Sequence, residues 1–219
     1  EKIKASLKEK SFSELKALWA CNEKITEQNI ERLSSMDLRE KLIPALLSYD
    51  GIAYQYMAPT VFETEMLSYV QEHLRILSGF YGIVRPMDGV TPYRLEMQAK
   101  LEMDGAKNLY EYWGDRLYKE VRDSSGIIIN LASKEYAKCI EKYLQPSDRY
   151  ISCNFFEEQE GKLVQKGVYC KMARGEMVRF MAENRVEEPE GIKDFAVMGY
   201  RYAKELSSEK EYIFVRKKA

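Results

Sequence analysis

Two glycines and the cations that follow them, in the stretch Glu72–Leu101, are the residues best placed for chemistry. Gly79 and Gly82 stand where we predict that one helix ends and another begins. Glycine tolerates the backbone conformation of such a corner and lets a ligand approach closely. Unpaired N–H groups at a helix start, together with the helix dipole, suit phosphate. The other candidates for this phosphate site are Ser78, Phe80, Tyr81, Arg85, Arg94 and Lys100.

The helix that enters this corner is predicted from apolar residues that recur at helical spacing between about residues 63 and 77. A helix, then apolar-x-Gly-apolar-x-Gly, then a new helix is the helix-hairpin-helix pattern of sequence-independent DNA binders. Pro86 disfavours helix at Arg85, so we expect the second helix to be short. The alternative is a turn between helices that only packs. If the corner holds phosphate, Gly82→Asp abolishes DNA binding and leaves the fold intact.

A second set of polar residues could form a pocket. Alternation in Tyr93–Met97 predicts a half-buried strand with Arg94 and Glu96 on one face. The two side chains are either a structural ion pair or an arginine anchor beside a working carboxylate. The apolar run Gly126–Ser133 predicts a central strand covered on both faces, and α/β folds place ligands where such strands end. Ser133 also suits a helix N-cap. The candidate pocket consists of Tyr93, Glu96, Asn130, Ser133 and Glu135.

Three further cations, Lys171, Arg174 and Arg179, lie in or beside a helix predicted to span Ala173–Phe180. Positive charge at the start of a helix opposes the helix dipole and costs a little stability. Lys171 and Arg174 stand at that start, which hints at an anion nearby. We therefore count all three cations among the DNA-binding candidates.

Several sequence blocks carry a resemblance to a known family. They include H-L-R-I-L-S-G-F-Y-G-I-V-R-P-M-D at 73–88, P-Y-R-L-E-M at 92–97, N-L-A-S-x-E-Y at 130–136 and K-x-A-R-G-x-M-x-R-F at 171–180. In this order, over about Ser48 to Val215, the chain closely resembles the YaaA-type peroxide-stress-resistance proteins of bacteria. The resemblance implies a cytoplasmic α/β protein with a helix-hairpin-helix element, affinity for duplex DNA and a role in limiting iron-dependent oxidative damage. Family members begin with a short strand and a Ser-Pro-Ala-Lys-like segment, for which we expect no counterpart in this sequence.

Composition bounds these hypotheses. Charged residues make up 32% of the 219 residues and the formal net charge is −1, so any DNA surface must be a local concentration of cations. No apolar run approaches the ~20 residues of a membrane span. Four scattered cysteines predict reduced thiols, and a single histidine, His73, removes most histidine-based catalytic and metal sites. Neither a G-x-G-x-x-G nor a G-K-[ST] phosphate motif occurs. We expect no cofactor, no metal site and no membrane partner.

The remaining pattern predicts one α/β domain over residues 1–219, with a central mixed sheet flanked by helices and a helical N-terminal part at residues 1–40. Ser11 and Glu14 form a predicted capping box for a short helix. Further strands are expected at Arg149–Phe156 and Leu163–Cys170, joined by a turn at Glu160-Gly161, and in a final hairpin that ends at Val215.

Three classes of function follow. The first is a DNA-binding protein that grips the duplex backbone without reading bases. The second is an enzyme acting on a nucleotide or DNA lesion through the Arg/Glu/Asn polar cluster. The third is an iron-handling protein with carboxylate ligands. We favour binding over catalysis, with double-stranded DNA as the partner. The sequence does not identify any protein partner.

Overall fold

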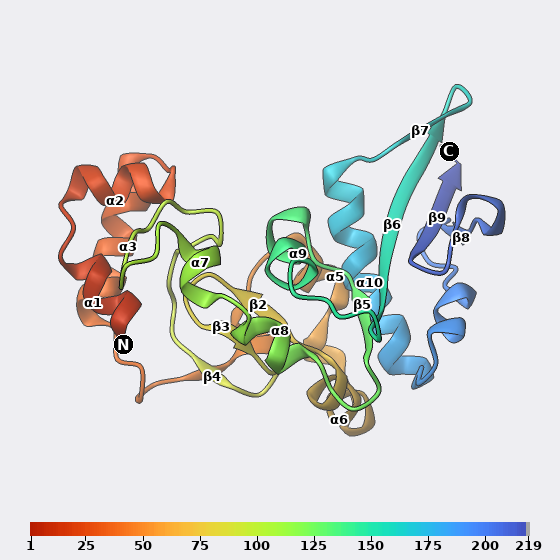
Figure 1. Ribbon diagram of the computed structural model, residues 1–219, viewed down its shortest axis with the longest axis horizontal. Coiled ribbons are helices and arrows are strands. Elements are labelled where there is room, and N and C mark those ends of the chain that lie inside the picture. The colour runs from red at the N-terminus through yellow and green to blue at the C-terminus, as the bar shows by residue number, and fades with distance from the viewer. Residues whose placement is uncertain (218–219) are drawn as a thin grey trace. The chain divides into compact units, whose positions relative to one another are not determined.

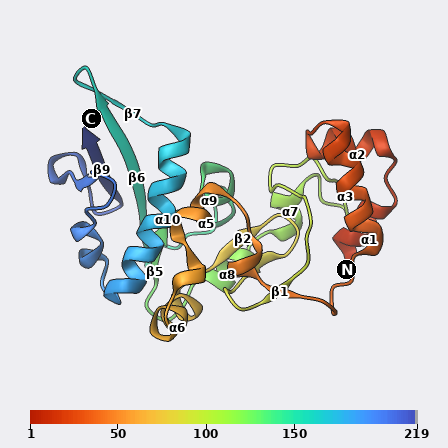
Figure 2. The same cartoon turned by 180° about the vertical axis from the view of Figure 1, so that it is seen from behind.

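The computed structural model describes residues 1–217 of the chain, which form two compact units (Figures 1 and 2). The first unit comprises Glu1–Ser48, Arg75–Val121 and Ala132–Leu144. The second comprises Tyr49–Leu74, Arg122–Leu131 and the residues from Gln145 onward. Both helices and strands occur in each unit, so the chain is a mixed α/β protein, as predicted. The prediction of a single domain over residues 1–219 stays a prediction.

Three helices open the first unit: α1 (Lys2–Lys8), α2 (Phe12–Trp19) and α3 (Glu23–Ser35). The capping box predicted at the start of α2 is confirmed. The N–H of Glu14 donates to the Ser11 hydroxyl, and the N–H of Ser11 donates to the Glu14 carboxylate at 2.8 Å. Leu15 and Trp19 are buried on the inner face of this helix. A short sequence signal therefore suffices to place the start of α2.

The rest of the first unit consists of short elements. Two antiparallel strand pairs, β1 with β4 and β2 with β3, alternate with single helical turns and short helices. These elements are β1 (Ile43–Pro44), α4 (Ala45–Ser48), β2 (Ile76–Ser78), β3 (Gly82–Val84), β4 (Gly89–Val90), α7 (Leu109–Trp113), α8 (Arg116–Val121) and α9 (Lys134–Glu141).

The predicted helix-hairpin-helix does not form at the paired glycines. Helix α6 (Thr64–His73) ends before them, and the following residues form the β-hairpin β2–β3, with Ile76 opposite Val84. The apolar residues on either side of the turn therefore pair as strands. The Gly82 backbone adopts a φ of +81°, which closes the turn in a conformation that glycine favours. Pro86 then prevents a helix from following.

The second unit contains the sheet. Its strands run in the order β5-β6-β9-β8, and β7 pairs with β6. The β5–β6 and β6–β9 pairs are parallel, whereas β6–β7 and β8–β9 are antiparallel, so the predicted mixed sheet is confirmed. The elements of this unit are α5 (Ile52–Met57), η1 (Pro59–Val61), α6, β5 (Ile127–Asn130), β6 (Arg149–Gln159), β7 (Lys162–Val164), α10 (Gly167–Asn184), η2 (Pro189–Asp194), β8 (Arg201–Tyr202), η3 (Lys204–Leu206) and β9 (Glu211–Lys217).

Two strand predictions in this unit need correction. The apolar run Gly126–Ser133 was expected at the centre of the sheet, yet β5 lies at the end of the strand order and is only partly buried. The centre is β6, whose inward side chains Ile151, Cys153 and Phe155 belong to the main core. The predicted strand Leu163–Cys170 stops at Val164, and the helix begins at Gly167.

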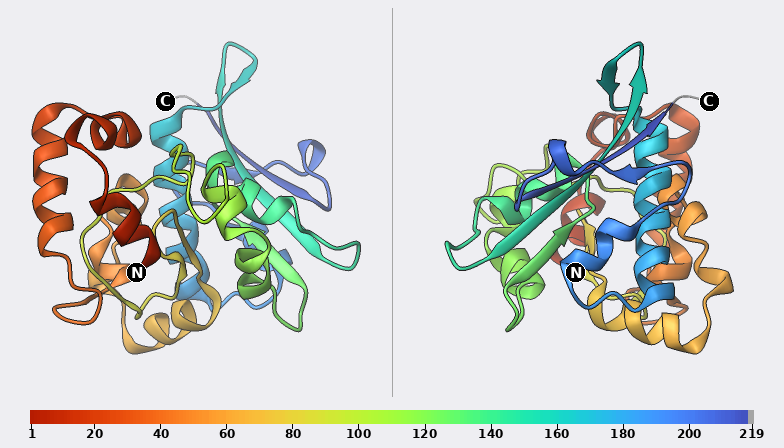
Figure 3. Two further views of the ribbon diagram at one scale, coloured as in Figure 1. Left: turned by 60° about the vertical axis from the view of Figure 1, so that its left-hand side comes forward. Right: turned by 90° about the vertical axis from the view of Figure 1, so that its right-hand side faces the viewer.

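Helix α10 runs along the sheet beside β6 (Figure 3). Ala173 and Met177 on α10 are fully buried in the same core as Phe155 of β6. On another side, Gly175 packs against α5, where a Cβ would lie 2.9 Å from the backbone nitrogen of Met57 and closer still to the carbonyl oxygen of Ala53. Packing on two sides fixes the rotation of this helix.

Candidate functional site

The paired-glycine corner is closed. Ser78, Gly79, Phe80 and Gly82 are buried. The backbone N–H groups of Phe80 and Tyr81 donate to the Ser78 hydroxyl at 3.1 and 2.9 Å, so these donors are already satisfied. The burial of Gly79 and Gly82 gives no support to the prediction that their backbone amides are open to a phosphate.

Both glycines serve packing instead. A Cβ on Gly79 would lie 2.6 Å from the carbonyl oxygen of Leu95, and one on Gly82 would lie 2.8 Å from the indole ring of Trp113. The Trp113 indole Nε1 donates to the carbonyl oxygen of Gly79 at 3.0 Å and ties the ring to the corner. Among the alternatives left open by the sequence, a turn that packs describes the corner, although strands flank it.

Tyr93 belongs to this corner and not to a polar pocket. Its ring stacks on Phe80 with 5.1 Å between centroids and meets Tyr81 edge-on at 5.3 Å. Its hydroxyl lies 2.6 Å from the hydroxyl of Ser78. Three of the predicted phosphate-site residues and one predicted pocket residue thus form a single packed cluster.

Beside this cluster lies a cleft of about 610 Å³ in the first unit. One wall is the segment 94–100, which turns at residues 97–99, and the other is the end of α2 with the residues around it. The strand predicted at Tyr93–Met97 does not form, although burial alternates along it, with Leu95 and Met97 buried. The residues that line this cleft, called here the Arg94 cleft, are Lys10, Glu14, Ala17, Leu18, Trp19, Ala20, Arg94, Glu96, Gln98, Ala99 and Lys100.

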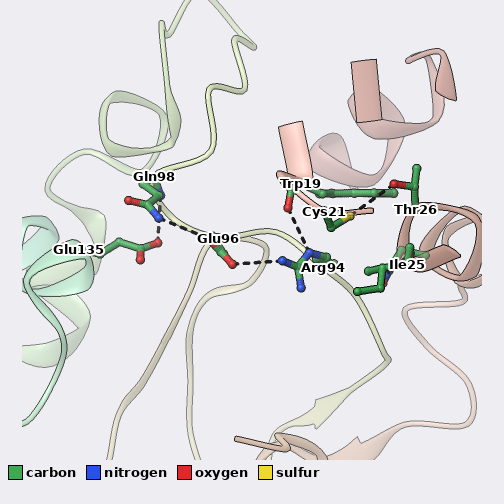
Figure 4. Close-up of polar contacts among 9 residues, drawn as sticks. Trp19, Cys21, Ile25, Thr26, Arg94, Glu96, Gln98 and Glu135 are labelled. Carbon is green, nitrogen blue, oxygen red and sulfur yellow. Dashed lines mark hydrogen bonds and ion pairs between the residues drawn. The ribbon is translucent and has the colours of Figure 1, made fainter. Parts of the chain in front are cut away.

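Polar contacts fix the wall formed by the segment 94–100 (Figure 4). The Arg94 Nε donates to the carbonyl oxygen of Trp19 at 3.3 Å, and its Nη2 lies 3.5 Å from a carboxylate oxygen of Glu96. Gln98 joins two carboxylates: its side-chain amide donates to Glu96 at 3.3 Å and its backbone N–H to Glu135 at 3.2 Å. The structure thus brings together Arg94, Glu96 and Glu135, three of the residues singled out from the sequence.

The Arg94 cleft carries an excess of positive charge. Lys10 and Lys100 form no ion pair and no side-chain hydrogen bond with any of residues 1–217. Of the two carboxylates, Glu96 is paired with Arg94, and Glu14 is engaged in the helix cap. Hydrogen bonds from Ser11, followed by the charge of Lys10, lower the pKa of Glu14 and keep it ionised. This cleft is a local concentration of cations on a chain whose net charge is −1.

Arg85 lies in a second, smaller hollow of about 170 Å³ on the same unit, together with Arg75 and Arg116. Sequence reasoning missed the last two. Since Ile76 pairs with Val84, the β2–β3 register places Arg75 next to Arg85 across the hairpin, a relation that only a strand prediction reveals. The hollow also contains the carboxylates of Asp88 and Glu120, so it is less strongly cationic than its arginines suggest.

The other predicted residues are dispersed. Asn130 lies in the second unit, where its side-chain amide donates to the Ser152 hydroxyl at 3.1 Å. Ser133 occupies the N-cap position of α9, as its alternative role predicted, but its side chain makes no capping hydrogen bond. The five predicted pocket residues therefore do not converge within either unit.

The cations on α10 stand in the helix and not at its start. Because α10 begins at Gly167, Lys171 and Arg174 lie beyond the first turn, and the expectation that they oppose the helix dipole is wrong. Lys171 is exposed, while Arg179 pairs with Glu183 one turn further along at 2.7 Å. Arg174 is partly buried, and its Nε has no hydrogen-bond partner among the described residues.

The cysteines and carboxylates do not form a reactive or metal-binding centre in the part of the chain described. All four cysteines are free, as predicted, and burial raises the pKa of the Cys139 and Cys153 thiols to about 12. Protonated, buried thiols react slowly with peroxide. No group of three or more His, Cys, Asp or Glu side chains within residues 1–217 is placed to hold a metal ion. Likewise, none of the described helices combines the length and the apolar character that crossing a bilayer requires.

Comparison with known proteins gives the family. The sequence model of the family described as "Peroxide stress protein YaaA" matches residues 1–206. A UPF0246 protein of Agathobacter rectalis is 64% identical over 211 residues, covering 96% of this chain and 85% of the relative. UPF0246 proteins of Lachnoclostridium phytofermentans and Ligilactobacillus salivarius are 51% and 48% identical, each over 96% of this chain and over 82% and 85% of the relative. The chain belongs to the peroxide stress protein YaaA family.

Proposed function

We propose that this protein binds duplex DNA through the phosphate backbone during the cellular response to hydrogen peroxide, in the cytoplasm, and thereby limits oxidative damage to DNA. The family supports the peroxide response. The observation that carries the DNA contact is the Arg94 cleft, where Lys10 and Lys100 have no ionic partner among the described residues. Unpaired lysines that line one cleft offer charge to a polyanion without first breaking an ion pair.

Side chains provide the proposed contact to the DNA phosphates, because the backbone amides of the glycine corner are buried. Ammonium and guanidinium groups on phosphates position a protein on DNA but read no base. Binding is therefore independent of sequence, and each phosphate contact contributes about 0.9 to the slope of log affinity against log salt concentration.

Removal of the two unpaired lysines tests this proposal. We expect the double substitution Lys10→Gln/Lys100→Gln to weaken binding of a labelled duplex, measured by fluorescence anisotropy, and to reduce the salt slope by roughly 2. The matched control is Lys16→Gln/Lys119→Gln, which changes net charge equally at lysines already paired with Glu23 and Asp115. Equal affinities and slopes for the two double variants would contradict the proposal.

A second candidate function is favoured by one observation, the chain of contacts from Arg94 through Glu96 and Gln98 to Glu135. In an enzyme acting on a nucleotide or DNA lesion, Arg94 would hold an anionic group and Glu96 would serve as the base. The Arg94 cleft falls within the usual size range of small-molecule sites, which is roughly 300–1,000 Å³. Turnover on nucleotide or damaged-DNA substrates that Glu96→Gln abolishes would establish this function. DNA affinity without turnover would contradict this enzymatic function and leave DNA binding as the remaining proposal.

A further inference from the structure

Arg174 carries a charge that the folded chain does not balance. Its Nε is sealed from solvent and donates no hydrogen bond to any of the described residues, and its guanidinium forms no ion pair with any of residues 1–217. Burial accordingly lowers the pKa of this guanidinium. The arginines around it in the second unit differ, since Arg179 pairs with Glu183 and Arg216 with Glu157.

The packing of α10 keeps Arg174 in this environment. Its chain neighbours Ala173 and Gly175 are both buried, Ala173 against the sheet and Gly175 against the backbone of α5. A rotation of α10 that exposed Arg174 would break both contacts. The helix therefore holds a partly desolvated positive charge that lacks a counter-charge, and such a group is unfavourable until an anion or hydrogen-bond acceptor joins it.

We propose that Arg174 is the anchor of a binding site for a phosphate group carried by a small molecule, with Lys171 supplying a second positive charge. Lys171 stands three residues earlier, on the same side of α10, and is exposed without an ion pair among the described residues. A guanidinium binds two phosphate oxygens at once, and a phosphate of charge about −2 is matched by two cations better than a carboxylate is.

The size of the ligand follows from burial. Part of the Arg174 side chain remains accessible, but its Nε does not. A single phosphate group needs only the accessible part of this side chain, so the ligand proposed is inorganic phosphate or the phosphate of a small metabolite. This site is separate from the DNA contact proposed for the Arg94 cleft, which lies in the other unit.

Replacement of Arg174 by an apolar residue of similar length distinguishes a ligand-binding arginine from a structural one. The two roles predict opposite changes in melting temperature. In buffer free of phosphate, we expect Arg174→Met to have a melting temperature equal to or above that of the unmodified chain, because an unbalanced charge is removed. Inorganic phosphate and pyrophosphate should bind the unmodified chain in isothermal titration calorimetry, and Arg174→Met should weaken that binding on the order of tenfold to a hundredfold.

Two further substitutions complete the test. Lys171→Gln, at an exposed position, should weaken phosphate binding several-fold without a change in melting temperature. Arg179→Met, on the same helix at an arginine paired with Glu183, should bind phosphate like the unmodified chain. Arg174→Met should also bind labelled duplex DNA normally, so that failure of this proposal and failure of the DNA proposal are distinguishable.

Four results would overturn the proposal. The first is no phosphate or pyrophosphate binding by the unmodified chain. The second is a lower melting temperature of Arg174→Met in phosphate-free buffer, which would identify a structural arginine. The third is acetate binding as tight as phosphate binding, which would exclude the phosphate class. A thermal shift that phosphate causes equally in the unmodified chain and in Arg174→Met is the general salting effect and also counts against the site.

Discussion

The stability of a Gly82→Ala variant tests whether the paired-glycine corner is packed or open. Two costs follow from the structure. An L-residue at a φ of +81° is strained by about 1–2 kcal/mol. In addition, the new Cβ would lie 2.8, 2.9 and 3.0 Å from three carbons of the Trp113 ring. The ring cannot easily move, because its Nε1 donates to the carbonyl oxygen of Gly79 and Tyr112 packs edge-on against it. Overpacking of this kind costs about 1–3 kcal/mol, so we expect a total loss of roughly 2–5 kcal/mol in the free energy of unfolding.

A matched glycine separates the two costs. Gly105 has a φ of +79° and nothing within 4 Å of a built Cβ, so Gly105→Ala carries only the backbone strain. Urea unfolding of both variants, followed by circular dichroism and compared at equal m-values, gives the steric cost by difference. We expect Gly82→Ala to be less stable than Gly105→Ala by about 1–3 kcal/mol.

Equal stability of the two variants would refute this reasoning, because it would mean that Trp113 does not cover Gly82. The same geometry changes the expectation for Gly82→Asp. The sequence predicted a folded protein that has lost DNA binding, whereas the buried corner has no room for an aspartate and no partner for its charge. Gly82→Asp should therefore fail to fold, and a soluble, cooperatively unfolding Gly82→Asp would reopen the phosphate interpretation.

Two further predictions concern the second unit. Gly175→Ala forces a Cβ into the backbone of α5 and should lower the free energy of unfolding by about 2 kcal/mol or more, despite the better helix propensity of alanine. The control is Gly167→Ala, which adds a Cβ in open space at the start of the same helix and should be neutral or stabilising. Hydrogen bonds from Lys166, Arg216 and Gln159 lower the pKa of Glu157 to about 2 from an ordinary value of 4.5, so its contribution to stability is full above about pH 4.5 and is lost as the pH falls towards 2. Glu157→Gln should flatten the stability profile in that window, and an unchanged profile would show that other carboxylates dominate it.

Local signals account for what the sequence predicted correctly. The Ser11 capping box, the turn at Glu160-Gly161 and the pairing of β8 with β9 each depend on residues close together in the chain. The pairing of Arg94 with Glu96 also follows from alternation over three residues. In each case neighbouring residues alone determine the geometry.

The errors in prediction arose where residues far apart in the sequence determine the local structure. A short apolar run such as the one around Ile76 fits a helix face or a strand equally well. The strand forms here within a hairpin whose corner is covered by Trp113, 34 residues beyond Gly79. Glu135 reaches Gln98 across 37 positions, and no pattern in the sequence links them. The position of β5 at the end of the strand order depends equally on long-range pairing, because a continuous apolar run does not reveal which strands flank it.

The family resemblance is confirmed, while the physical role attached to its most prominent motif is not. Because Gly79 and Gly82 are needed for packing, their presence is explained without any ligand, and they carry no information about phosphate binding. Evidence for anion binding must then come from charges that the fold leaves unbalanced. Lys10 and Lys100 in the Arg94 cleft are such charges, and so is Arg174 on α10, whereas Arg179 and Arg216 already have carboxylate partners. The unpaired cations lie in different units and differ in burial, so a polymer suits the open cleft and a small phosphate suits the partly closed position on α10.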